Sequence, residues 1–172
     1  MAGQSATIRK SATAEIRVKP INGFIGAEIE GVDLRRPLSP AQFKVVHDAL
    51  VQYEVIVLRD QDITVDQQMA FGALFGELSI HPFSPNLADK PEVIILDYSA
   101  ENPPALTDIW HVDETFRETP PLGTILRAKT VPEVGGALCV RSSGKNGAEK
   151  SLGWEVNARS RRSHPTLGLL EV

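Results

Sequence analysis

Residues 110–116 have the sequence WHVDETF, in which His111 and Asp113 are well suited to binding a metal ion. In an extended segment, residues two apart project to the same face, so one imidazole nitrogen and one carboxylate oxygen can reach the same ion. A histidine and a carboxylate are two arms of the facial triad that holds Fe(II) in non-haem oxygenases and leaves positions open for an oxoacid and dioxygen. The same pair also fits a structural histidine held by a nearby carboxylate, or a zinc or iron site of cupin type without redox chemistry. The spacing alone leaves these interpretations open.

Two helices and several strands are predicted around this motif. Ser39 and Gln42 can form a capping box with Pro40 at the first helical position, which predicts a helix over residues 40–53. Thr64 and Gln67 repeat the pattern and predict a second helix that continues through Phe75. Runs typical of β-strands occupy residues 25–34, 54–60, 92–98 and 123–131. The mixture predicts a strand-rich α+β domain.

The composition excludes several classes of protein. With 172 residues, 42% hydrophobic and 23% charged, the chain suits one folded domain. A net charge of -4 and the lack of a Lys/Arg run disfavour nucleic acid as a partner. The single Cys139 cannot close an intrachain disulfide, and the longest aliphatic run, residues 55–58, is too short to cross a membrane. We therefore expect a cytoplasmic protein with no membrane or nucleic-acid partner.

The charge pattern divides the chain into three parts. Residues 1–136 carry seven more acidic than basic side chains, whereas residues 137–172 carry three more basic than acidic ones. The last part also lacks helical or strand periodicity over most of its length. The predicted organisation is a flexible N-terminus (1–15), a folded region (16–136) and an unrelated polar tail (137–172) of loop or disorder.

Several motifs occur together in the folded region. They are GAEIEGVDL (26–34), LRDQ (58–61), FGEL (75–78), HP (81–82), WHVDETF (110–116), TPP (119–121) and GG (135–136). In this order and spacing, the region strongly resembles the taurine dioxygenase and 2,4-dichlorophenoxyacetate dioxygenase family of Fe(II)- and 2-oxoglutarate-dependent enzymes. The resemblance implies an α+β fold with a mainly β core, a double-stranded β-helix (jelly roll) with flanking helices, incomplete here. It also implies that His111 and Asp113 are catalytic iron ligands.

The resemblance further implies a reaction and a class of substrate. 2-Oxoglutarate and O2 would be converted to succinate and CO2 while a small anionic organic substrate, a sulfonate or a carboxylate, is hydroxylated. His81 matches the family histidine that contacts the substrate anion, although next to Pro82 it could equally be a loop histidine bonded to backbone. Ser84 and Thr107 replace a tyrosine and an asparagine that contact taurine, which favours another anion. The family also suggests a homo-oligomer.

The resemblance stops after Gly136. Ala137 and Leu138 stand where the family has Asp-Thr, so the threonine that helps bind 2-oxoglutarate is not present, and neither are the distal histidine and the oxoacid-binding arginine. His164 lacks the family's context and distance and is not expected to be a metal ligand. The nearby arginines 159, 161 and 162 are expected to be solvated charge and not an oxoacid-binding site. We expect a frameshifted or chimeric end and a truncated chain with weak activity or none. The alternative is a non-catalytic remnant that acts as a binding or oligomerisation module.

Overall fold

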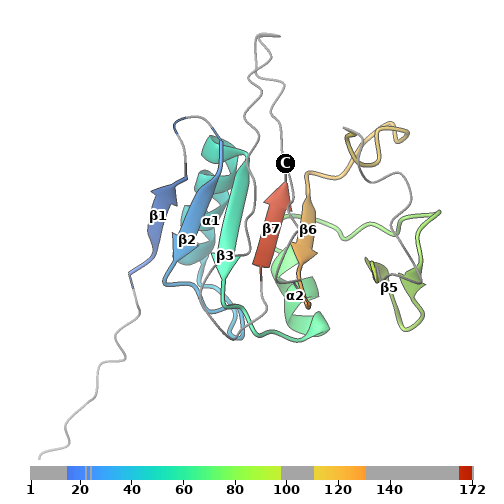
Figure 1. Cartoon of the computed structure of the whole chain (residues 1–172), viewed down its shortest axis with the longest axis horizontal. Helices are drawn as coiled ribbons and strands as arrows, with labels where there is room; N and C mark the ends of the chain where they lie inside the picture. The colour runs from blue at the N-terminus through green and yellow to red at the C-terminus, as the bar shows by residue number, and fades with distance from the viewer. Residues whose placement is uncertain (1–14, 22, 24, 98–110, 131–166, 172) are drawn as a thin grey trace, which may run out of the picture.

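The computed structural model describes residues 15–21, 23, 25–97, 111–130 and 167–171. These residues form a five-stranded sheet, a two-stranded sheet and two helices (Figure 1). The large sheet has the order β1-β2-β3-β7-β6. Its strands are β1 Arg17–Pro20, β2 Ala27–Glu30, β3 Val55–Arg59, β7 Leu167–Glu171 and β6 Thr124–Arg127.

The strand directions follow from the connections. β1 and β2 are antiparallel neighbours, with Val18 opposite Ile29. β2 and β3 are parallel, with Ala27 opposite Ile56, because helix α1 (Pro40–Tyr53) forms the crossover between them. β7 is antiparallel to both β3 and β6. The large sheet is therefore mixed.

Both predicted helix starts are confirmed. The side chain of Ser39 accepts from the backbone N–H of Gln42, whose side-chain oxygen accepts from the Ser39 N–H at 2.9 Å. Thr64 and Gln67 form the same reciprocal pair at the start of α2 (Val65–Gly72). Each box satisfies two backbone donors that the first helical turn leaves without partners. Local sequence therefore determines where both helices begin.

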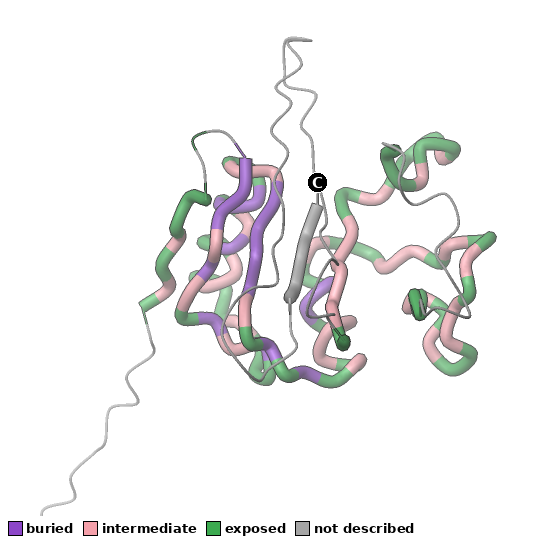
Figure 2. The backbone as a smooth tube through the Cα atoms, viewed as in Figure 1, coloured by how far each residue is buried: buried purple, intermediate pink, exposed green. Residues whose placement is uncertain are grey.

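The hydrophobic core lies between the helices and the middle of the sheet. Residues 55–58 of β3 are all buried, and Val46 and Leu50 of α1 pack in one cluster with Ile56 and with Phe71 of α2. Figure 2 shows the buried backbone concentrated in β2 and β3, whereas β1 and the segments beyond β6 are mostly half-buried or exposed. The best-packed part of the described structure is thus the N-terminal half of the large sheet.

A small hairpin lies beyond the far end of the large sheet (Figure 1). It pairs β4 (Asn86–Leu87) with β5 (Lys90–Ile94) in antiparallel register. Lys90 donates to Asp66 in the first turn of α2, with an Nζ–Oδ1 distance of 2.5 Å. This ion pair connects the hairpin to α2. No helix in the described part of the chain is long and apolar enough to cross a membrane.

One expectation is wrong and others lie outside the described residues. Residues 167–171 were expected to be loop or disorder, but they form β7. The run LGLLE is compatible with a strand, and its backbone provides hydrogen-bond partners for the adjacent edges of β3 and β6. The boundary at residue 136 and the segments 1–14 and 131–166 are not described, so the three-part organisation remains a prediction.

Candidate active site

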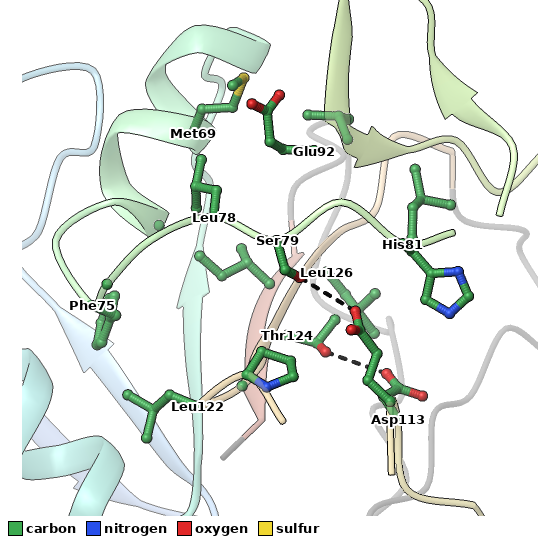
Figure 3. Close-up of a pocket in the computed structure, with 18 of the residues that line it drawn as sticks. Met69, Phe75, Leu78, Ser79, His81, Glu92, Asp113, Leu122, Thr124 and Leu126 are labelled. Atoms are coloured by element: carbon green, nitrogen blue, oxygen red, sulfur yellow. Dashed lines mark hydrogen bonds between the residues drawn. The ribbon is translucent and has the colours of Figure 1, made fainter. Parts of the chain in front are cut away.

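A cavity of about 540 Å³ lies between α2, β5, β6 and the segments 77–84 and 113–114. Its polar lining includes Ser79, His81, Glu92, Asp113 and Thr124. Figure 3 shows His81 and Asp113 on the same side of this cavity, with apolar side chains such as Leu78 and Leu122 opposite. Three of the residues singled out from sequence, His81, Ser84 and Asp113, therefore line one cavity, although His81 and Asp113 are 32 positions apart in the sequence.

The structure brings His111 and Asp113 together. The Nε2 atom of His111 lies 3.3 Å from Oδ1 of Asp113, and the two side chains are 59% and 51% exposed. Asp113 lines the cavity, whereas His111 is outside the residues that line it. The pair thus stands at the margin of the cavity and is accessible to solvent.

This geometry fits one metal ion. Two ligands bound side by side to an octahedral ion, at about 2.1 Å each, are about 3 Å apart. The observed 3.3 Å between the two donor atoms is close to that separation. Within the described residues, no group of three His, Cys, Asp or Glu side chains is placed to hold a metal ion. The described structure therefore supplies two donors of a mixed nitrogen and oxygen type, as Fe(II) accepts.

Thr124 of β6 orients the carboxylate of Asp113. Its hydroxyl donates to Oδ2 of Asp113 at 3.3 Å (Figure 3). The other carboxylate oxygen, Oδ1, is the one that lies 3.3 Å from Nε2 of His111. A hydrogen bond to the second carboxylate oxygen is a common way to fix the direction of a metal-binding carboxylate. Thr124 cannot be recognised from the sequence, because a threonine in a strand gives no local signal of such a contact.

His81 is held through one ring nitrogen. Its Nδ1 accepts from the backbone N–H of Phe83 at 3.2 Å and contacts the hydroxyl of Ser84 at 2.7 Å. Since a backbone N–H can only donate, Nδ1 is the acceptor of a neutral ring, Ser84 donates to it, and the hydrogen is carried by Nε2. The backbone bond expected of a loop histidine is thus present, and it sets the tautomer that can donate from Nε2 to an anion.

Ser84 has a contact that sequence comparison did not predict. It was singled out as the replacement of a tyrosine, but in the structure its hydroxyl fixes the His81 ring. Asn86 adds a hydrogen bond from Nδ2 to the backbone carbonyl of His81 at 2.9 Å. His81, the candidate anion contact, is therefore fixed at both its side chain and its backbone. Residues 79–81 are called the anion-contact segment, after this candidate role. Thr107, His164, the arginines 159, 161 and 162, and residues 135–138 lie outside the described residues.

A family model matches most of the chain. The model described as taurine catabolism dioxygenase TauD, TfdA family, matches residues 17–144. The chain belongs to this family. The match includes the sheet strands β1, β2, β3 and β6, both helices, and all of the candidate site residues described above. The family resemblance inferred from the sequence motifs is thereby confirmed.

Several individual proteins that are similar to this chain have names that fit the family match. An alkylsulfatase from Acinetobacter baylyi is 34% identical over 131 residues, which are 76% of this chain and 40% of the relative. An alpha-ketoglutarate-dependent sulfate ester dioxygenase from Pseudomonas putida is 39% identical over 123 residues, 71% of this chain and 40% of the relative. The crystal structure of a taurine dioxygenase from Burkholderia xenovorans has 37% identity and a TM-score of 0.62, covering 71% of this chain and 43% of that one. The chain thus spans about 40% of the length of these relatives.

Proposed function

We propose that this chain carries the iron-binding and anion-binding part of a 2-oxoglutarate-dependent dioxygenase of the jelly-roll type. The observation that supports it best is the pairing of His111 and Asp113 at 3.3 Å beside a cavity that Asp113 shares with His81. Family membership supports the class of reaction, and the distance between His111 and Asp113 and their place beside the cavity support these residues as the metal ligands. Fe(II) bound there with 2-oxoglutarate and O2 would supply hydroxylation coupled to release of succinate and CO2.

Each side chain has a task that its contacts support. His111 and Asp113 would hold the iron through Nε2 and Oδ1, and Thr124 keeps the Asp113 carboxylate turned toward the histidine. His81 would donate from Nε2 to an oxygen of the substrate anion, because Phe83 and Ser84 occupy Nδ1. The 2-oxoglutarate site is not assigned to any residue of the described structure.

We propose a sulfate ester or a related organic anion as substrate. The cavity combines one histidine donor with an apolar wall that includes Leu78, Val93, Ile94, Leu122 and Leu126. Such a wall suits an alkyl group better than the short polar chain of taurine. Two of the relatives are named for alkyl sulfates or sulfate esters, which agrees with this choice.

The test is metal binding by the chain as it stands. Mn(II), a spectroscopic substitute for Fe(II), is titrated into the protein under electron paramagnetic resonance, with and without 2-oxoglutarate. We expect binding that His111→Ala and Asp113→Asn each weaken at least about tenfold, since each removes one of two donors. The control is His47→Ala, which removes a histidine that packs on Phe43 and Phe75 instead. Mn(II) affinity that survives either site substitution unchanged would refute the proposal.

Turnover is tested separately from binding. Succinate formation is measured with Fe(II), 2-oxoglutarate, O2 and either hexyl sulfate or taurine. We expect more succinate with hexyl sulfate wherever turnover is detected, and equal or greater turnover with taurine would refute the proposed substrate class. Metal binding without succinate formation would show that this chain binds the metal ion but does not catalyse the reaction.

A second function, association with another polypeptide, is favoured by exposed apolar residues near the cavity. Ile95, Leu96 and Leu122 are each about half exposed, at 52%, 57% and 50%. Exposed large apolar side chains of this kind favour contact with another polypeptide. If this surface mediates self-association, light scattering after gel filtration will give a mass above one chain, and Leu96→Glu will restore the single-chain mass.

A further inference from the structure

Glu114 and Arg117 connect the candidate metal-binding turn to the anion-contact segment. Glu114 directly follows Asp113, and its Oε1 accepts from the hydroxyl of Ser79 at 3.3 Å (Figure 3). Its Oε2 pairs with Nε of Arg117, whose Nη2 donates to the backbone carbonyl of Ile80 at 2.7 Å. Ser79 and Ile80 immediately precede His81. Two independent contacts thus run from the turn after Asp113 to the two residues before His81.

A ring contact provides another path between the same places. The guanidinium of Arg117 lies 5.6 Å from the centre of the Phe116 ring. That ring meets the His81 ring edge to face, with centres 5.9 Å apart. Arg117 therefore acts on the His81 segment through its backbone at Ile80 and on the His81 side chain through Phe116.

Glu114 combines a strained backbone conformation with a largely buried side chain. Its φ angle is +51°, in the left-handed region that residues other than glycine rarely adopt, and its side chain is only 10% exposed. Both the backbone strain and the desolvation of a carboxylate oppose folding. A partly buried ion pair of this kind is weak evidence for a stabilising role, whereas it does fix the distance between the segments it joins.

We propose that Glu114 and Arg117 are positioning residues that couple metal binding at His111 and Asp113 to anion binding at His81. The inference rests on the proposed function. The carboxylate of Glu114 is occupied by Ser79 and Arg117, so it acts through its neighbours and not as a ligand. When a metal ion orders the turn, the Glu114–Arg117 pair holds Ser79, Ile80 and hence His81 in the orientation that receives the anion. By thermodynamic reciprocity, the anion strengthens metal binding by the same factor.

The test measures this coupling factor directly. The dissociation constant of hexyl sulfate is determined by calorimetry in the unmodified chain, without metal and with saturating Mn(II). We expect Mn(II) to tighten hexyl sulfate binding at least about fivefold, within the usual range for coupled sites. In Glu114→Gln, which keeps the size and the Ser79 contact but loses the ion pair, the factor falls below about two. The dissociation constant for Mn(II) alone stays within about threefold of the unmodified value.

Matched variants separate positioning from general structure. Glu118→Gln removes an exposed carboxylate from the same stretch of chain and keeps the full coupling factor. Ser79→Ala removes only the hydroxyl that reaches Glu114, and we expect it to lower the coupling factor too. It replaces Glu114→Gln as the test if circular dichroism shows that Glu114→Gln does not fold.

The outcomes distinguish the two proposals. Absence of Mn(II) binding in the unmodified chain, or binding insensitive to His111→Ala, refutes the proposed function and the coupling with it. Mn(II) binding that depends on His111 but leaves hexyl sulfate affinity unchanged refutes the coupling alone. A coupling factor that Glu114→Gln and Ser79→Ala leave intact refutes it as well.

Discussion

Replacing Thr124 by valine tests whether the strand β6 orients the carboxylate of Asp113, the proposed metal ligand. The substitution removes the hydroxyl that donates to Oδ2 of Asp113 and keeps a β-branched side chain of the same shape. Valine suits a strand at least as well as threonine, so the fold is expected to persist. Any change in metal binding then reports on the orientation of Asp113.

The size of the effect follows from the geometry. A hydrogen bond to a charged group is worth about 1.5–3 kcal/mol when it is short and buried. Here the two oxygens are 3.3 Å apart and the Asp113 side chain is 51% exposed, so water competes for the carboxylate. We therefore expect a loss of about 1 kcal/mol, which corresponds to about a fivefold rise in the Mn(II) dissociation constant.

The assay is a titration of Mn(II) followed by electron paramagnetic resonance, with urea unfolding as the check on stability. Thr124→Ser is the control, because it keeps the hydroxyl and loses only a methyl group. We expect Thr124→Ser to bind Mn(II) like the unmodified chain. An unchanged dissociation constant in Thr124→Val, or equal losses in both variants, would show that the hydroxyl does not orient Asp113.

Three further predictions concern the anion contact, the core and the pH dependence. Ser84→Ala removes the hydroxyl on Nδ1 of His81, and we expect hexyl sulfate affinity to fall about threefold to tenfold by calorimetry. Gln61→Leu leaves the carbonyl of Val32, the half-buried carbonyl of Arg59 and the backbone N–H of Leu34 without their side-chain partner, and urea unfolding should show a loss of about 3 kcal/mol. The hydrogen bond from Lys44 lowers the pKa of Asp48, so its stabilising effect is present above the ordinary carboxyl pKa and disappears as the pH falls through the lowered value. Nuclear magnetic resonance should therefore find a higher Asp48 titration midpoint in Lys44→Met.

The sequence predicted those elements that local chemistry determines. The helix over residues 40–53 has the predicted bounds because Ser39, Gln42 and Pro40 act within four residues of one another. The strand expected over residues 25–34 is shorter, from Ala27 to Glu30. Gly26 and Gly31 adopt positive φ angles of 87° and 82° and interrupt the extended conformation on both sides. A Cβ on Gly31 would also meet the carbonyl oxygen of Glu15 at 2.5 Å, a contact that only the fold reveals.

The missed elements depend on contacts between distant parts of the chain. β7 pairs Glu171 with Val55 across more than a hundred residues, and no pattern within residues 167–171 specifies that partner. The candidate site likewise contains one feature that the local sequence predicts and others that depend on contacts between distant segments. The spacing of His111 and Asp113 predicts that they share a face, whereas the contacts from Thr124 to Asp113 and from Ser79 to Glu114 join separate segments.

His111 and Asp113, the pair proposed to bind metal, are both exposed to solvent, so contacts that position them are important. His111 would bind a metal ion as a neutral imidazole, so within this pair the Asp113 carboxylate supplies the charge that attracts a cation. Because the Asp113 side chain is 51% exposed, water screens its attraction for a cation. Electrostatic attraction alone therefore cannot hold the turn in a binding geometry. Within the described residues, Thr124 restrains the Asp113 carboxylate itself, whereas the 10% exposed carboxylate of Glu114, joined to Ser79 and Arg117, ties the turn to the residues before His81 and so affects anion binding more than Mn(II) affinity.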